Sequence, residues 1–234
     1  ALPNAVKIIV PLIICLCLIR LSAADWPHWL GPKGNGVSTE SGWKSEISDP
    51  IWKSKVGVGF SSVSVAQGRL FTMGHNGRKS GGSETVYCLD AKTGDTLWTD
   101  SYSAPLIDYL YEGGPSSTPT VDGETVYTLS KHGLLHAYQV KDGKNIWKKN
   151  MLSLSDMRKP PTWGFAASPL VFENLLIIEA GATYALDKES GRVVWQSQKY
   201  RPAYGSPTIY NPTGKPMIAV IKTDGLVLLD AKNG

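Results

Sequence analysis

Short apolar runs separated by glycine, aspartate and asparagine recur along the chain and predict β-strands. In the clearest repeat the predicted strands are residues 118–121, 126–129, 134–140 and 145–147. The same order returns over residues 168–195 and begins again at 206–209. A looser copy runs from 62 to 98 and carries a polar, glycine-rich insertion at 74–83. After residue 24 no long run has an apolar period of 3.6 residues, which argues against an α/β fold.

A short signature closes each repeat with a glycine, and three of its copies have a tryptophan four residues later. The glycines are Gly94, Gly143, Gly191 and Gly234, at intervals of 49, 48 and 43 residues, and the tryptophans are Trp98, Trp147 and Trp195. A fixed period of this length indicates a repeat architecture. We predict an all-β chain, a β-propeller of four-stranded antiparallel blades. We expect each glycine to form a left-handed turn and each tryptophan to lie flat against the neighbouring blade.

The signature, as in residues 89–98 and 186–195, resembles the tryptophan-docking repeat of the pyrroloquinoline-quinone (PQQ)-like propellers. The resemblance covers residues 51–234, and the propellers of this superfamily usually have eight blades. It implies about four blades here, in a chain truncated at its C-terminal end. The superfamily includes quinoprotein alcohol dehydrogenases and the non-catalytic propeller B subunit of the bacterial outer-membrane assembly machinery, so the repeat alone leaves the activity open.

The N-terminal sequence predicts export. The apolar run Ile8–Ile19 follows Lys7, and small residues at 22–24 provide a cleavage site, so residues 1–24 are typical of a signal peptide. An uncleaved membrane anchor is the alternative, although 12 apolar residues are fewer than the roughly 20 that a span requires. Residues 25–50 are predicted to form a strap packed on the propeller. We expect the protein in the periplasm or cell envelope, with membrane association only through an uncleaved signal or a partner.

The charge balance argues against a nucleic-acid partner. The formal net charge is +4, and without residues 1–24 the basic and acidic residues number 22 and 20. Envelope proteins are the expected partners.

The resemblance to quinoprotein dehydrogenases implies a specific set of residues if the chain is an enzyme. Those enzymes hold PQQ with a calcium ion, a catalytic aspartate, a tryptophan under the quinone and often a vicinal cysteine pair. After residue 24 the only cysteine is Cys88, and no acid-rich cluster stands out. His132 and His136 are separated by a turn at Gly133, which is a poor zinc spacing. We therefore predict no catalytic residue, no metal ligand and no cofactor, with PQQ and calcium as the alternative.

The loops that lead from one blade to the next are the candidate binding surface. They comprise residues 109–115, 158–165 and 199–204. Glu112, Trp163, Arg201 and Tyr204 stand at comparable points in these loops and could grip a polar ligand or a peptide. The alternative is that Trp163 and Tyr204 close the mouth of the central channel while the charged residues face water.

Three functions are compatible with these features. The first is an exported, non-catalytic propeller that serves as a protein-interaction scaffold. The second is a PQQ-dependent quinoprotein dehydrogenase with part of its site outside this sequence. The third is a sensor or substrate-binding module fused to another domain.

Overall fold

The computed structural model describes residues 24–42, 46 and 49–234, so most of the predicted signal peptide lies outside the described residues. The described chain is almost entirely β, as predicted, and forms four antiparallel sheets. The first sheet contains β1 (Ser64–Ala66), β2 (Arg69–His75), β3 (Ser83–Asp90) and β4 (Thr96–Ser103). The second contains β5 (Thr120–Asp122), β6 (Thr125–Leu129), β7 (Leu134–Gln139) and β8 (Asn145–Asn150).

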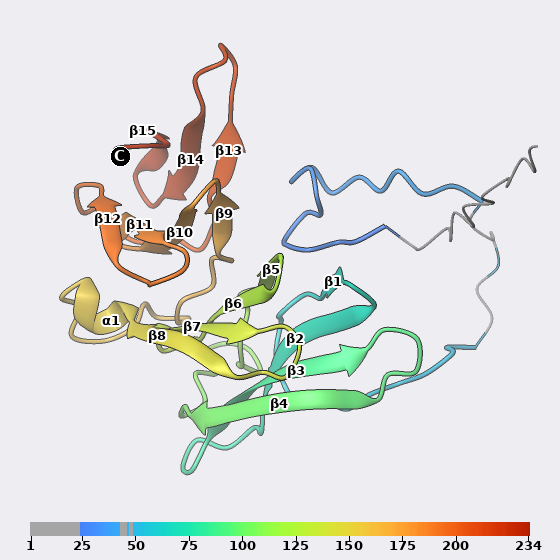
Figure 1. The fold of residues 1–234 in the computed structure, drawn as a ribbon. Helices are drawn as coiled ribbons and strands as arrows, with labels where there is room; N and C mark the ends of the chain where they lie inside the picture. Colours follow the sequence, from blue (N-terminus) through green and yellow to red (C-terminus); the bar gives the residue numbers. More distant parts are fainter. Residues whose placement is uncertain (1–23, 43–45, 47–48) are drawn as a thin grey trace, which may run out of the picture.

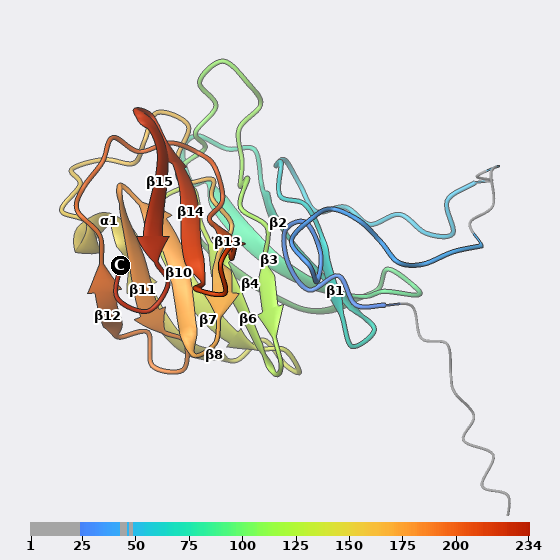
Figure 2. The same ribbon diagram turned by 90° about the horizontal axis from the view of Figure 1, so that it is seen from above.

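The third sheet contains β9 (Leu170–Phe172), β10 (Leu175–Ala180), β11 (Ala182–Asp187) and β12 (Val193–Gln196). The fourth has three strands, β13 (Thr208–Tyr210), β14 (Met217–Lys222) and β15 (Gly225–Asp230). Within each sheet, consecutive strands are neighbours. The sheets follow one another around an arc, with β1, β5, β9 and β13 toward its centre (Figures 1 and 2). This is the arrangement of blades in a partial β-propeller.

The local structure departs from the sequence pattern in three places. The insertion at 74–83 contributes to the first blade, because the β2–β3 ladder runs from Arg69↔Asp90 to His75↔Glu84. A four-residue helix, α1 (Met151–Leu154), follows β8, and the Asn150 side chain caps it by accepting from the Ser153 N–H. The spacing of Trp52, 46 residues before Trp98, predicts an outer strand at residues 51–56, but these residues form no strand within the described chain.

The core lies between adjacent sheets, and β10 shows how. Leu176 and Ile178 pack in a cluster that includes Tyr127 from the second sheet. Leu175 and Ile177 pack in another cluster, with side chains from the fourth sheet. Neighbouring residues of a strand point to opposite faces of the sheet. An unbroken apolar run is therefore typical of a strand, such as β10, that is buried on both faces.

The repeat tryptophans and glycines meet across neighbouring sheets. The Trp98 indole Nε1 donates to the Val140 carbonyl at 2.9 Å, and the Trp147 Nε1 donates to the Lys188 carbonyl at 3.1 Å. A Cβ added at Gly143 would lie 2.6 Å from the Trp98 ring. At Gly94 the ring is that of Trp52, so residues 51–56 place a tryptophan against the first sheet in the same way.

The segment after residue 24 contacts the inner edge of the first two blades. Trp26 and Val65 exchange backbone hydrogen bonds of 2.7 and 2.9 Å, and the Pro27 carbonyl accepts from the Val121 N–H at 2.7 Å. Figure 1 shows this segment, in blue, beside β1 and β5. In the part of the chain that is described, no helix is long and apolar enough to cross a membrane.

Candidate functional site

The turns between the second and third strands of each blade share one end of the sheets with the crossover loops. In the first blade, Ser83 at the start of β3 pairs with Ser103 at the end of β4. In the second blade, Leu134 at the start of β7 pairs with Asn150 at the end of β8. Loops far apart in sequence therefore gather on one face, which we call the turn face.

The turn face carries a cleft of about 390 Å³ that is open to solvent. Its lining comes from three crossover loops and from the β6–β7 turn. The lining residues are Tyr109, Leu110, Tyr111, Ser116, Lys131, Trp163, Ala166 and Tyr204. Aromatic rings predominate, and Lys131 is the one charged residue among them.

The aromatic walls are held in place by contacts between the loops. The rings of Trp163 and Tyr204 are tilted at 5.2 Å, and Tyr111 packs on Phe60 at 5.4 Å. Trp163 nevertheless remains 42% exposed, so one side of its ring is available to a ligand. The walls are preformed and apolar, as in many recognition sites.

Lys131 forms the polar part of the cleft although the whole residue is only 2% exposed. Its Nζ donates to the Tyr111 hydroxyl at 2.6 Å and to the Trp163 carbonyl at 2.7 Å. Burial lowers the pKa of Lys131 to about 8, against the attraction of Glu84. Among the described residues, no carboxylate lies within ion-pair distance of this ammonium.

Glu84 lies behind Lys131, at the start of β3. Its Oε1 accepts from the Lys131 backbone N–H at 3.2 Å, and its Oε2 accepts from the Tyr102 hydroxyl at 3.3 Å. Burial raises the pKa of Glu84 to about 7, while these hydrogen bonds and the Lys131 charge oppose the rise. The carboxyl group and the ammonium thus sit in the same buried environment without a direct ion pair.

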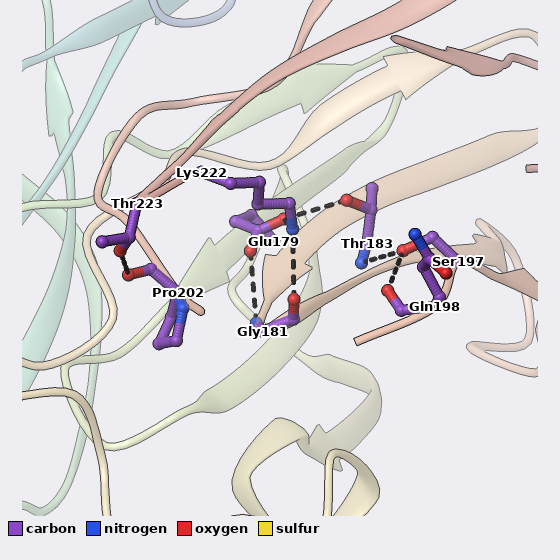
Figure 3. Close-up of polar contacts among 8 residues, drawn as sticks. All are labelled: Glu179, Gly181, Thr183, Ser197, Gln198, Pro202, Lys222 and Thr223. Carbon is purple, nitrogen blue, oxygen red and sulfur yellow. Dashed lines mark hydrogen bonds and ion pairs between the residues drawn. The ribbon is translucent and has the colours of Figure 1, made fainter. Parts of the chain in front are cut away.

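A second buried pair lies on the turn face between the third and fourth blades. The Lys222 Nζ donates to Glu179 Oε2 at 2.5 Å and to the Gly181 carbonyl at 3.2 Å. Figure 3 shows these contacts. Thr183 Oγ1 donates to the same carboxylate oxygen at 2.9 Å. Burial raises the pKa of Glu179 and lowers that of Lys222, and their mutual attraction opposes both shifts.

This second pair underlies one wall of the cleft. The Lys222 ammonium lies 5.3 Å from the centre of the Tyr200 ring. Thr223 Oγ1 donates to the Pro202 carbonyl at 2.7 Å, a contact drawn in Figure 3. These contacts anchor the loop at residues 199–204, which carries Tyr204. The buried ion pair thus contacts the loop that carries Tyr204 but does not line the cleft.

The predicted site residues did not include these charged residues, although three of them share one position in the repeat. Lys131, Glu179 and Lys222 each stand twelve residues before the signature glycine of their blade, namely Gly143, Gly191 and Gly234. This position lies near the end of the second strand or just after it, and all three residues there are buried. A charged residue recurring at such a position is a signal for a buried polar network.

The structure brings together two of the four predicted site residues. Trp163 and Tyr204 line the cleft and contact each other. Glu112 is exposed and does not line the cleft. Arg201 points to Asp224 in an exposed ion pair and does not line it either.

A calcium ion bound with a quinone cofactor, as in the resembled dehydrogenases, takes several oxygen ligands. Within the described ranges, no three His, Cys, Asp or Glu residues lie close enough to hold a metal ion. The cleft itself contains no carboxylate among its lining residues. The two histidines weighed as a zinc pair are used elsewhere, since His132 Nε2 lies 2.7 Å from the Pro105 carbonyl and His136 packs between Tyr102 and Tyr138.

Comparisons with known proteins agree with this architecture. The sequence family described as outer membrane protein assembly factor BamB matches residues 82–234. A comparison with curated proteins gives no match.

Solved structures with the same fold include a quinohemoprotein alcohol dehydrogenase from Comamonas testosteroni, 16% identical with a TM-score of 0.62 over 92% of this chain and 41% of that chain. The quinohemoprotein alcohol dehydrogenase ADHIIG from Pseudomonas putida HK5 is 17% identical, with a TM-score of 0.54 over 78% of this chain and 34% of its own. BamB from Moraxella catarrhalis is 17% identical, with a TM-score of 0.46 over 71% of this chain and 56% of its own. At these identities the two dehydrogenases show the fold alone, and the chain spans less than half of either.

Proposed function

The chain belongs to the family of PQQ-like propellers described as outer membrane protein assembly factor BamB, and from this membership we propose that it is an exported, non-catalytic scaffold for protein interactions in the cell envelope. Its partners would be envelope proteins. The signal-peptide pattern of residues 1–24 supports export.

The observation that carries the proposal is the composition of the cleft on the turn face. Aromatic side chains from several loops form a preformed, solvent-open surface. Aromatic residues contribute large contact areas at low entropic cost, which is why they predominate at protein interfaces. The cleft has a single buried ammonium and no carboxylate in its lining, which favours recognition of a partner over a calcium-assisted quinone reaction.

The first experiment separates the scaffold from a quinoprotein dehydrogenase. The protein without residues 1–24 is titrated with PQQ and calcium while tryptophan fluorescence is followed. Trp163→Phe reports the cleft, and Trp29→Phe is the matched control because Trp29 is comparably exposed, at 45%, but lies in the N-terminal segment. A scaffold gives no saturable quenching at micromolar cofactor. Quenching lost only in Trp163→Phe, with dye reduction when alcohols are added, would overturn the proposal.

A second experiment tests the interaction directly. A photo-crosslinking amino acid is placed at Leu110, in the cleft lining, or at Leu97, an exposed position on the outer strand β4. In envelope preparations we expect discrete adducts from position 110 and none from position 97. Equal adducts from both positions would indicate non-specific contact and contradict the proposed interaction face.

A further inference from the structure

Two lysines at the same place in the repeat have different partners. Lys222 and Lys131 both stand twelve residues before the signature glycine, and both are almost fully buried. The Lys222 ammonium is neutralised by Glu179, a residue of the preceding blade. The Lys131 ammonium turns toward the cleft and is held by two neutral oxygens, of Tyr111 and Trp163.

Glu84 is the acidic residue close to Lys131, but it forms no ion pair with the Lys131 ammonium. Glu84 also comes from the preceding blade, but its carboxyl oxygens accept from the Lys131 backbone N–H and from Tyr102. An ammonium group has three donors, and neutral acceptors occupy two of them here. The cleft therefore contains a buried positive charge with one remaining donor and no carboxylate in its lining.

We propose that the cleft binds an acidic side chain of a partner polypeptide, with the carboxylate on the Lys131 ammonium and a neighbouring apolar side chain against Trp163 and Tyr204. This inference rests on the proposed function and names the chemistry of the partner. A carboxylate would supply the charge complementarity that Glu179 provides to Lys222 in the fourth blade. Truncating either member of a buried charged pair is costly, so the contact would discriminate strongly between acids and amides.

The surroundings of the cleft favour a polypeptide over a small free acid. Tyr109 and Leu110 line the cleft but are 58% and 79% exposed, so they present apolar surface to a large partner. Leu110 has a backbone φ of +64°, an unusual conformation for leucine. Such strain persists only where surrounding structure fixes it, and it is concentrated at functional sites. The ion pair of Lys79 with Asp108, at 2.9 Å, ties this loop to the first blade.

The test uses two short peptides that differ in one functional group. Acetyl-Phe-Glu-Phe-amide carries the carboxylate, and acetyl-Phe-Gln-Phe-amide replaces it with an amide of the same shape. Binding to the full chain is measured by NMR of ¹⁵N-labelled tryptophan indoles, with the Trp163 signal assigned through Trp163→Phe. We expect the glutamate peptide to shift the Trp163 signal with a dissociation constant about tenfold or more below that of the glutamine peptide.

Substitutions of Lys131 test whether its ammonium causes the difference in affinity between the two peptides. Lys131→Met should remove the difference between the peptides, whereas Lys131→Arg should retain part of it. Lys199→Met is the matched control, because Lys199 lies on a cleft-forming loop but its side chain is 65% exposed. Loss of the Lys199 charge should change the affinities for both peptides only slightly, because an exposed charge is screened by solvent.

The possible outcomes distinguish this inference from the proposed function. Equal binding of the two peptides at Trp163 would overturn the carboxylate site while leaving an apolar interaction surface. Binding of neither peptide would also overturn it. If PQQ with calcium saturated the same Trp163 signal, both the inference and the scaffold would be wrong.

Discussion

Gly143 is under two constraints at once, one from its own backbone and one from its neighbour. Its φ is +72°, which glycine adopts readily, and a Cβ there would lie 2.6 Å from Trp98. We expect Gly143→Ala to lower the free energy of unfolding by about 2–4 kcal/mol, through backbone strain and overpacking. Urea denaturation measures the change.

Gly68 provides the control for that substitution. Its φ is +71°, but no atom lies within 4 Å of a Cβ built there. Gly68→Ala should therefore cost only the backbone strain, about 1 kcal/mol. Equal losses at the two glycines would show that the tryptophan contact contributes nothing.

Glu84 makes stability depend on pH in an identifiable range. Because its pKa rises from 4.5 to about 7 on folding, the folded state binds the proton more tightly than the unfolded state. Its contribution to stability is thus complete below pH 4.5 and is lost as the pH rises through about 7. We expect Glu84→Gln to reduce the fall in unfolding free energy between pH 5 and 7 by about 1–3 kcal/mol.

The charged and titratable neighbours of Glu84 are Lys131 and Tyr102. Lys131 has a pKa of about 8, so the range from pH 5 to 7 mainly reports the carboxyl group. The exposed Glu112 provides the control for the substitution itself, and Glu112→Gln should change the unfolding free energy only slightly. Parallel profiles for the wild type and Glu84→Gln would contradict the prediction.

At the scale of elements, the third and fourth blades are joined by the Glu179–Lys222 pair. Both side chains are almost completely buried, at 1% and 0% exposed. Lys222→Met leaves the carboxylate without its cation and should cost about 3–5 kcal/mol of unfolding free energy. The double substitution Glu179→Leu with Lys222→Met should recover most of that loss, because no buried charge remains unpaired. A double variant as unstable as Lys222→Met would contradict this account.

The strands could be predicted from sequence because each is bounded by residues that force turns. The predicted strand at 118–121 begins two residues too early, since β5 starts at Thr120. There the Thr118 N–H donates to the Ser168 side chain of the next blade at 2.9 Å instead of joining a ladder. Helix α1 was also missed, because its short apolar segment depends on the Asn150 cap and on packing against the second blade.

At the scale of the whole molecule, the gathering of crossover loops on one face follows from the repeat alone. Which side chains enter the cleft does not, because that depends on how neighbouring blades are rotated. Trp163 and Tyr204 turn inward, whereas Arg201, only three residues before Tyr204, pairs with Asp224 at the surface. The proximity of Lys131 and Glu84 could not be predicted from a local motif, because the two residues are far apart in sequence and belong to different blades.

A substitution of Trp52 can show whether residues 51–56 stabilise the first blade. Its ring covers Gly94 as Trp98 covers Gly143, and Ser54 Oγ donates to the Gly94 carbonyl at 2.6 Å. We expect Trp52→Ala to loosen the turn at residues 90–95, lowering its local opening free energy by about 1–3 kcal/mol. Hydrogen exchange of the Gly94 amide, which donates to the Asp90 carbonyl at 2.9 Å, reports this opening.

The equivalent turn at 187–191 supplies an internal reference, because Trp147 covers Gly191 there. Its exchange should not change in Trp52→Ala, since blades of a repeat protein contact only their neighbours and open locally. Ile51→Ala controls for the substitution itself, as Ile51 is 95% exposed. Faster exchange in both turns would mean that the blades open as one unit. Unchanged exchange at Gly94 would mean that the first blade does not depend on Trp52, and that residues 51–56 lie against it without stabilising it.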